Sequence, residues 1–255
     1  MPILALDFDG VLCDSVEETG TAGWKAGGAI WRDMAADRPP PALLDGFRRA
    51  RPAIETGYQA IVLMRLLRDG VAPDRLLADF DAREPAVVAR AGCDVAALKA
   101  LFSATRDRWL AAEPDAWAAL SPLYPGVAEW LRTQAADSDC YIVTTKERRF
   151  VERLLSGAGV AFPSRRIFGL DYGRPKEAVL AELLERHPRG TVCFVEDRLA
   201  TLIRCRAQPG LERVAMRLAG WGYNTVAERG AAEHLSIPVW ELTDLFRSFD
   251  QESQP

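Results

Sequence analysis

Two aspartates one residue apart, Asp7 and Asp9, follow the first apolar run of the chain, Ile3 to Leu6, and Gly10 comes directly after them. An apolar run that ends abruptly in charge is typical of a buried strand whose carboxyl end lies at the edge of a sheet. Side chains two residues apart on a strand point to the same side. Two like charges so close need a cation or a shared proton, so the spacing predicts a ligand site.

Polar residues also follow later apolar runs. Thr144 and Thr145 end the run that begins at position 140, Lys176 opens a predicted helix, and Glu196 and Asp197 end the run 191–195. Carboxylate oxygens are ligands that Mg²⁺ prefers, whereas hydroxyl, amide and ammonium groups hold phosphoryl oxygens. The combination predicts a phosphate group held against a divalent metal ion.

The elements that would position these residues alternate between strand and helix from Ser121 onward. Such strict succession predicts a mostly parallel sheet covered by helices on both faces. We expect the first apolar run to belong to the same sheet. Ligands of open α/β sheets bind at the carboxyl ends of the strands, which is where the acids and hydroxyls fall.

The segment between these two parts is rich in Ala, Leu and Arg and poor in β-branched runs, which predicts helices only. Its first helix is expected from Val16 to about Ala36, with Asp14 or Ser15 as the N-cap. The predicted fold is therefore α/β, with a parallel-sheet core formed by residues 1–15 and 122–255 and an inserted all-helical domain at 16–121.

Composition limits the partners that this chain can be expected to have. The 32 Lys and Arg nearly balance the 36 Asp and Glu, for a net charge of −4, so we expect no nucleic acid or anionic membrane as a partner. No apolar stretch approaches the roughly 20 residues of a membrane span. Five scattered cysteines without metal-type spacing favour a reducing compartment, so we expect a cytoplasmic protein that binds small molecules. The oligomeric state cannot be read from the sequence.

Four segments also resemble a known family. The run D-F-D-G-V-L-C-D-S from Asp7, then Thr144-Thr145-Lys146, then Lys176 in G-R-P-K, then Glu196-Asp197, resemble in order the four motifs of the haloacid dehalogenase superfamily. This resemblance implies a Rossmann-like core with an inserted helical cap, as in phosphoglycolate phosphatases and β-phosphoglucomutases. It also implies an enzyme, a phosphoric monoester hydrolase.

The resemblance implies roles for the first two acids. Asp7 would be the nucleophile that takes the phosphoryl group as an aspartyl phosphate, and Asp9 the general acid and then the general base. A carboxylate is already ionised at neutral pH and needs no activating base.

The resemblance also implies a binding site for Mg²⁺ and for the phosphoryl group. The metal ligands would be Asp7, Asp9 through its backbone carbonyl, and Asp197, with Glu196 bound directly or through a water molecule. The expected phosphate-binding residues are Gly10, Thr144, Thr145 and Lys176.

Three functions remain open at this point. The first is a Mg²⁺-dependent phosphatase acting on a small phosphorylated metabolite. The second is a phosphomutase, favoured by Glu196-Asp197 in place of the glycine-aspartate pair that the family more often has. The third is a non-catalytic protein that binds a phosphorylated ligand on the same fold. The residues of the helical segment do not identify the substrate.

Overall fold

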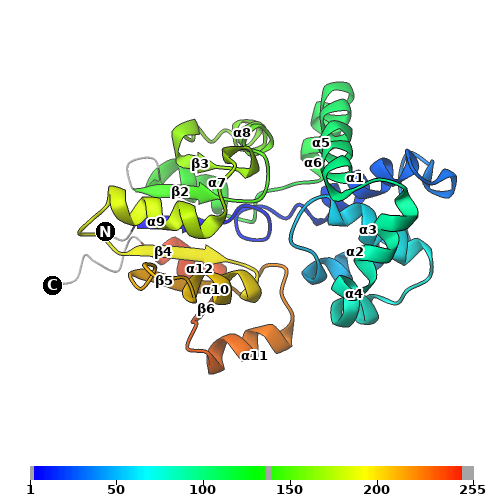
Figure 1. Ribbon diagram of the computed structural model, residues 1–255. Helices are drawn as coiled ribbons and strands as arrows, with labels where there is room; N and C mark the ends of the chain where they lie inside the picture. The colour runs from blue at the N-terminus through cyan, green and yellow to red at the C-terminus, as the bar shows by residue number, and fades with distance from the viewer. Residues whose placement is uncertain (1–2, 136–138, 249–255) are drawn as a thin grey trace. The chain divides into compact units, whose positions relative to one another are not determined.

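The computed structural model describes residues 3–135 and 139–248 (Figure 1). The chain divides into two compact units. One combines Met1–Asp14 with Leu123–Pro255, and we call it the sheet core. The other is Ser15–Pro122, and we call it the helical unit.

The described part of the sheet core contains one six-stranded sheet in the order β3-β2-β1-β4-β5-β6. Every neighbouring pair is parallel, which confirms the predicted α/β fold. Because β1 lies between β2 and β4, Leu6 pairs with Ile142 on one side and with Val195 on the other. The strands are β1 (Ile3–Leu6), β2 (Cys140–Val143), β3 (Ile167–Phe168), β4 (Val192–Glu196), β5 (Val214–Ala219) and β6 (Val239–Trp240).

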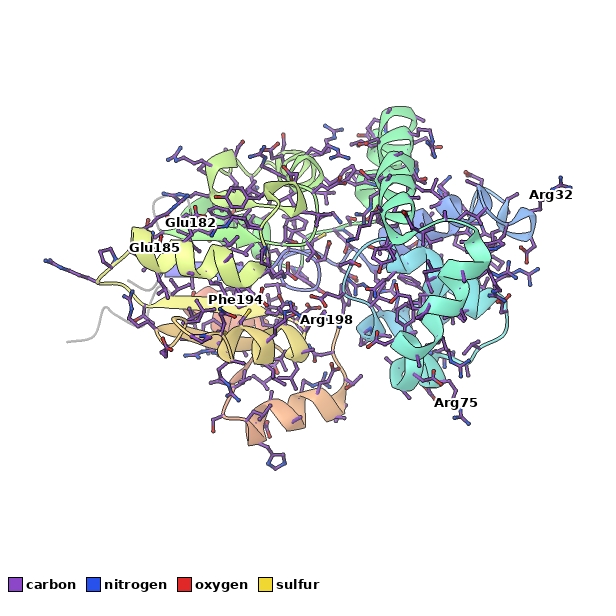
Figure 2. All side chains as sticks on the ribbon, viewed as in Figure 1. Arg32, Arg75, Glu182, Glu185, Phe194 and Arg198 are labelled. Atoms are coloured by element: carbon purple, nitrogen blue, oxygen red, sulfur yellow. The ribbon has the colours of Figure 1, made fainter. Side chains whose placement is uncertain are left out.

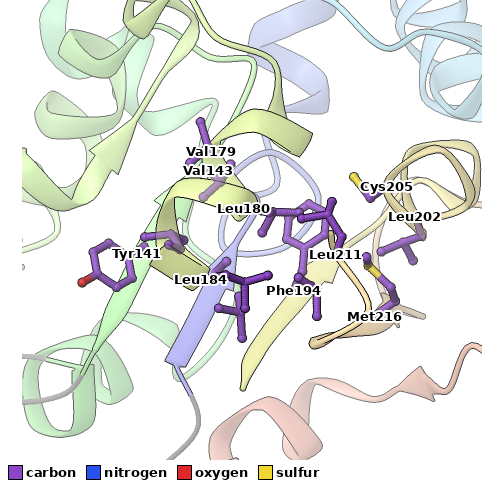
Figure 3. Packing of buried hydrophobic residues seen from close by; sticks show 14 of the residues in the cluster. Tyr141, Val143, Val179, Leu180, Leu184, Phe194, Leu202, Cys205, Leu211 and Met216 are labelled. Carbon is purple, nitrogen blue, oxygen red and sulfur yellow. The ribbon is translucent and has the colours of Figure 1, made fainter. Parts of the chain in front are cut away.

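Both faces of this sheet are buried, which explains why its central strands are apolar without alternation. On one face Ala5, Tyr141 and Phe194 pack against Leu180 and Leu184 of a covering helix (Figure 3). Neighbouring strand residues point to the opposite face and are also fully buried, among them Leu4 and Leu6. The helices of the sheet core are α7 (Val127–Trp130), α8 (Arg148–Gly157), α9 (Lys176–Arg186), α10 (Leu199–Arg206), α11 (Val226–His234) and α12 (Leu242–Arg247).

The helical unit contains six α-helices and two short 3₁₀ turns, and all of its residues are described. Across the described parts of both units, no helix is long and apolar enough to cross a membrane. The helices are α1 (Val16–Gly28), α2 (Pro41–Ala50), α3 (Gln59–Arg68), α4 (Pro73–Ala91), α5 (Val95–Ala112) and α6 (Pro114–Ala119).

The first helix is shorter than the sequence predicted. It ends at Gly28 instead of near Ala36, and Ser15 at its N-cap position makes no side-chain hydrogen bond to the backbone. After two glycines the chain turns back, and Met34 packs on Gly27 so closely that a Cβ there would lie 2.5 Å from the Met34 methyl carbon. Ser15 thus holds the predicted N-cap position, but the predicted end of the helix was wrong, because this packing ends the helix before its composition does.

A buried ion pair lies inside the helical unit. Arg106 of α5 donates through Nε and Nη2 to the two carboxylate oxygens of Glu18 in α1, at 2.8 and 2.6 Å. Trp117 of α6 donates its indole N–H to Glu18 Oε1 at 3.1 Å. The three helices are therefore joined through one carboxylate whose two oxygens both accept hydrogen bonds.

Candidate active site

The first acid of the site follows β1 without a break. The Asp7 N–H donates to Val195 O at 3.0 Å, which continues the β1–β4 pairing by one residue. The chain then turns, and the N–H groups of Leu12 and Cys13 donate to Phe8 O at 2.9 and 3.0 Å. This pairing and turn place Asp7 at the carboxyl end of the central strand with only 6% of its surface exposed.

Lys176, the first residue of α9, lies between the acids of two adjacent strands. Its Nζ is 2.6 Å from Glu196 Oε2 and 3.0 Å from Asp7 Oδ1. Although the second distance is that of an ion pair, no described donor is aligned for a hydrogen bond to the buried Asp7 Oδ1. The lysine therefore joins the two strand ends and leaves Asp7 Oδ1 without an aligned donor.

Three buried carboxylates converge at this place. Asp7, Glu196 and Asp197 each present a ligand oxygen, and these oxygens lie within 4.8 Å of one another. Glu196 is the last residue of β4 and Asp197 follows it, in the stretch of chain between Phe194 and Arg198, both of which are labelled in Figure 2. Buried carboxylate oxygens, one of them lacking an aligned donor, are a suitable ligand set for a hard divalent cation.

Burial strongly affects the protonation of these acids. It raises the pKa of Asp7 to about 6, with Lys176 acting in the opposite direction and Glu196 adding to the rise. Burial likewise raises the pKa of Glu196 to about 7, against the lowering effect of Lys176. The pKa of Lys176 lies above its usual range because Asp7 and Glu196 attract its charge more than burial disfavours it. One lysine thus compensates only part of the negative charge, so a cation would stabilise the ionised acids.

Asp9 has a partner that the sequence interpretation did not assign to the site. Lys146 Nζ lies 3.0 Å from Asp9 Oδ1, and the lysine side chain is fully buried. The available signal was its position directly after Thr144 and Thr145. A lysine next to a polar strand end is ordinarily interpreted as solvated, and only the pairing of β1 with β2 brings it to Asp9.

The residues expected to bind phosphate are in different environments. Thr144 is buried, and its hydroxyl accepts a hydrogen bond from the Lys146 N–H at 3.2 Å. Thr145 is half-buried. The Gly10 N–H donates to Cys13 O at 2.9 Å within the turn. A phosphate-binding role for these residues stays a prediction, as does a metal-binding role for the Asp9 carbonyl.

A Rossmann-like sheet with acid pairs after β1 and β4 and a buried lysine between them defines an α/β protein with a carboxylate-rich site at its strand ends. The family model of the haloacid dehalogenase-like hydrolases matches residues 1–203. The chain belongs to this hydrolase family. No curated protein matches the chain.

Solved structures with the same fold cover nearly the whole chain. A predicted phosphatase from Clostridium acetobutylicum is 14% identical with a TM-score of 0.61, covering 97% of each chain. A predicted phosphoglycolate phosphatase from Haemophilus somnus is 16% identical with a TM-score of 0.59, covering 98% of each chain. A HAD family hydrolase from Deinococcus radiodurans with bound phosphate and sodium is 14% identical with a TM-score of 0.53, covering 98% of this chain and 96% of that one. At these identities the likeness concerns the fold.

Proposed function

We propose that this hydrolase is a Mg²⁺-dependent phosphatase that cleaves small phosphate monoesters through an aspartyl phosphate on Asp7. The observation that carries the proposal is the convergence of Asp7, Glu196 and Asp197 at one end of the sheet, with Lys176 between the first two. Similar folds in two proteins described as predicted phosphatases, and in a HAD family hydrolase with bound phosphate, support it.

In the first step a carboxylate oxygen of Asp7 attacks the phosphorus and the bond to the leaving oxygen breaks. The pKa of about 6 leaves most of Asp7 ionised at neutral pH even before a cation binds. Lys176 would stabilise the negative charge of the transferring group, with Thr144 and Thr145 as further donors. Burial of Asp7 keeps bulk water from competing for its oxygens.

Asp9 would move the protons. It donates one to the departing alkoxide, and in the second step it takes one from the water molecule that attacks the aspartyl phosphate. Lys146, at 3.0 Å, would keep the Asp9 carboxylate oriented between these two tasks. The products are the free alcohol and inorganic phosphate, and Asp7 is restored.

The three converging carboxylates would hold the magnesium ion, which when bound neutralises charge on the phosphoryl oxygens. The helical unit would serve as a cap that selects the leaving group. We also propose that the protein acts in the cytoplasm, on a small metabolite, without nucleic acid or membrane as a partner. The near balance of charges supports these last points.

Phosphate release from a panel of small phosphate esters tests the proposal. We expect turnover with MgCl₂, loss of turnover with a chelator, and recovery when Mg²⁺ is restored. Acid-quenched protein should carry one labile phosphate on Asp7, detectable by mass spectrometry. Binding of phosphate esters by calorimetry without any turnover would instead favour the non-catalytic alternative.

A phosphomutase is the second candidate, favoured by the Glu196-Asp197 pair at the end of β4. A mutase returns the phosphoryl group to its substrate, so inorganic phosphate would form only slowly. Analysis of the products by phosphorus NMR separates the two. Accumulation of inorganic phosphate in step with the free alcohol supports the phosphatase, and an isomeric phosphate ester supports the mutase.

A further inference from the structure

The loop between β5 and α11 approaches the acids of the site from a part of the chain without a recognised motif. It contains Trp221, Gly222, Tyr223 and Asn224, and we call residues 220–224 the positioning loop. The indole N–H of Trp221 donates to Val11 O at 3.0 Å. This bond joins the loop to the turn that follows Asp9.

Three segments meet here at contact distance. Gly10 has φ +86°, and a Cβ on it would lie 2.1 Å from Asp197 Oδ2 and 2.9 Å from the Tyr223 ring. A Cβ on Gly222 would lie 2.4 Å from both Asp197 Cβ and Gly10 O. Only glycine allows the turn, the acid and the loop to approach so closely, so the position of Asp197 depends on both neighbours.

Tyr223 contacts two acids through two different groups. Its backbone N–H donates to Asp197 Oδ2 at 2.8 Å, and its hydroxyl donates to Asp14 Oδ1 at 2.8 Å. The first bond fixes the plane of the Asp197 carboxylate and therefore the direction of its other oxygen. The second fixes Tyr223 itself to the last residue of the amino-terminal segment of the sheet core.

Asn224 holds the same acid from the backbone side. Its amide Nδ2 donates to Asp197 O at 3.0 Å and to Ala219 O at 2.8 Å, at the end of β5. Arg229 of α11 donates to Asn224 Oδ1 at 2.9 Å, which fixes the amide orientation. The main chain and side chain of Asp197 are thus both restrained by consecutive residues of one loop.

We propose that Tyr223 and Asn224 are positioning residues that hold Asp197 in the geometry required for the divalent cation. The inference rests on the proposed function, since it concerns the cation of that site. Partners that orient a metal-binding carboxylate strongly affect metal affinity even though they do not touch the metal. The hydroxyl of Tyr223 acts indirectly, by keeping its own backbone N–H directed at Asp197.

Titration of the substrate-free protein with MgCl₂ by calorimetry tests this role. We expect Tyr223→Phe, which removes only the hydroxyl, to weaken Mg²⁺ binding about tenfold. Tyr172→Phe is the matched control, because its hydroxyl donates to Glu182 on the outer surface of the sheet core. It should bind Mg²⁺ as the wild type does.

A double-mutant cycle tests whether the hydrogen bond between Tyr223 and Asp14 accounts for the loss of Mg²⁺ affinity. If the bond between Tyr223 and Asp14 transmits the restraint, Tyr223→Phe, Asp14→Ala and the double variant should weaken Mg²⁺ binding by similar factors. A merely structural role would lower the melting temperature of Tyr223→Phe without changing its Mg²⁺ affinity, and that result would overturn the inference. Asn224→Ala, expected to weaken Mg²⁺ binding in the same direction, provides the test should Tyr223→Phe fold poorly.

Failure of the inference and failure of the proposed function give different results. If the wild type binds Mg²⁺ and releases phosphate while Tyr223→Phe and Asn224→Ala match it in affinity, only the positioning role is wrong. If the wild type itself neither binds Mg²⁺ nor releases phosphate, both are wrong. Weakened Mg²⁺ binding in both variants with unchanged Tyr172→Phe supports the inference.

Discussion

The two units of this protein bury charged side chains in opposite ways. In the helical unit, Glu18 is fully buried, and Arg106 donates to both of its oxygens while Trp117 donates to one. A carboxylate paired in this way has little capacity left for a ligand. Removing one partner of such a pair is costly because the other remains as an uncompensated buried charge.

In the sheet core the acids are only partly compensated. Asp7 and Glu196 share Lys176, and the pKa values of both acids are raised by burial. An arrangement that is poor for stability is suitable for binding, because an incoming cation supplies the missing charge. The difference teaches that burial of a charge does not by itself mark a site, whereas incomplete pairing does.

The largest effect is expected from Asp7→Asn. The amide is no nucleophile, so phosphate release should fall at least about 10⁴-fold while the fold is kept. Steady-state assays with circular dichroism as a folding check measure this. Asp81→Asn, on the exposed surface of α4, is the control and should keep wild-type activity. Full turnover by Asp7→Asn would contradict the view that the partly compensated acids perform the chemistry.

Arg106→Ala should remove the buried ion pair between Arg106 and Glu18 in the helical unit. Because Glu18 would stay buried without its partner, we expect a loss of about 3 to 5 kcal/mol in the free energy of unfolding. Urea unfolding followed by tryptophan fluorescence measures it. Arg108→Ala, an exposed arginine on the same helix, should cost less than about 1 kcal/mol. Equal losses in the free energy of unfolding for Arg106→Ala and Arg108→Ala would contradict the view that Glu18 depends on a complete set of partners.

Lys176→Met should affect activity more than folding. Loss of the ammonium group that stabilises the transferring phosphoryl group is expected to lower kcat about 100-fold, or about 3 kcal/mol. Stability should change less than in Arg106→Ala, because the raised pKa values allow Asp7 and Glu196 to take up protons. Lys99→Met, at an exposed lysine of α5, is the matched control. A kcat within about twofold of wild type would argue against a role for Lys176 in the reaction.

The smallest effect concerns pH. Without a cation, the folded-state pKa values of Asp7 and Glu196, about 6 and about 7, exceed their ordinary values of 3.8 and 4.5. The folded protein then binds more protons than the unfolded chain, so the stability contributed by these protons is lost as pH rises from about 4 to about 7.

Magnesium would compete with those same protons. We expect saturating MgCl₂ to raise the melting temperature by about 5 °C at pH 8 and by less than half of that at pH 5. Differential scanning fluorimetry at the two pH values measures this increase in melting temperature. In Asp7→Asn the increase caused by MgCl₂ should be smaller than in the wild type. A Mg²⁺ response that is equal at both pH values would contradict partial protonation of the site.

Much of the fold could be predicted because a continuous apolar run indicates a strand that is buried on both faces. The runs at 3–6, 140–143 and 191–195 each became a strand within one residue at either end. The end of α1 could not be predicted, since the packing of Met34 on Gly27 is a contact that composition does not report.

The chemical types at the strand ends could be predicted, but their pairings could not. Lys146 was passed over although it lies 3.0 Å from Asp9, and Tyr223 was not considered although it contacts Asp197. Lys146 follows two polar residues, and Tyr223 lies in a segment without a recognised motif. Their roles depend on partners 137 and 26 residues away, a separation at which local patterns carry no information.

The sequence by itself determined that acids, hydroxyls and a lysine would stand at strand ends, because the abrupt change from apolar to polar residues is a local property of the chain. Only the tertiary structure decided which of them meet. The strand order puts β1 between β2 and β4, so that Asp7 faces Lys176 and Glu196 while Asp9 faces Lys146. That order depends on the packing of helices on both faces of the sheet, which involves contacts between segments far apart in the chain.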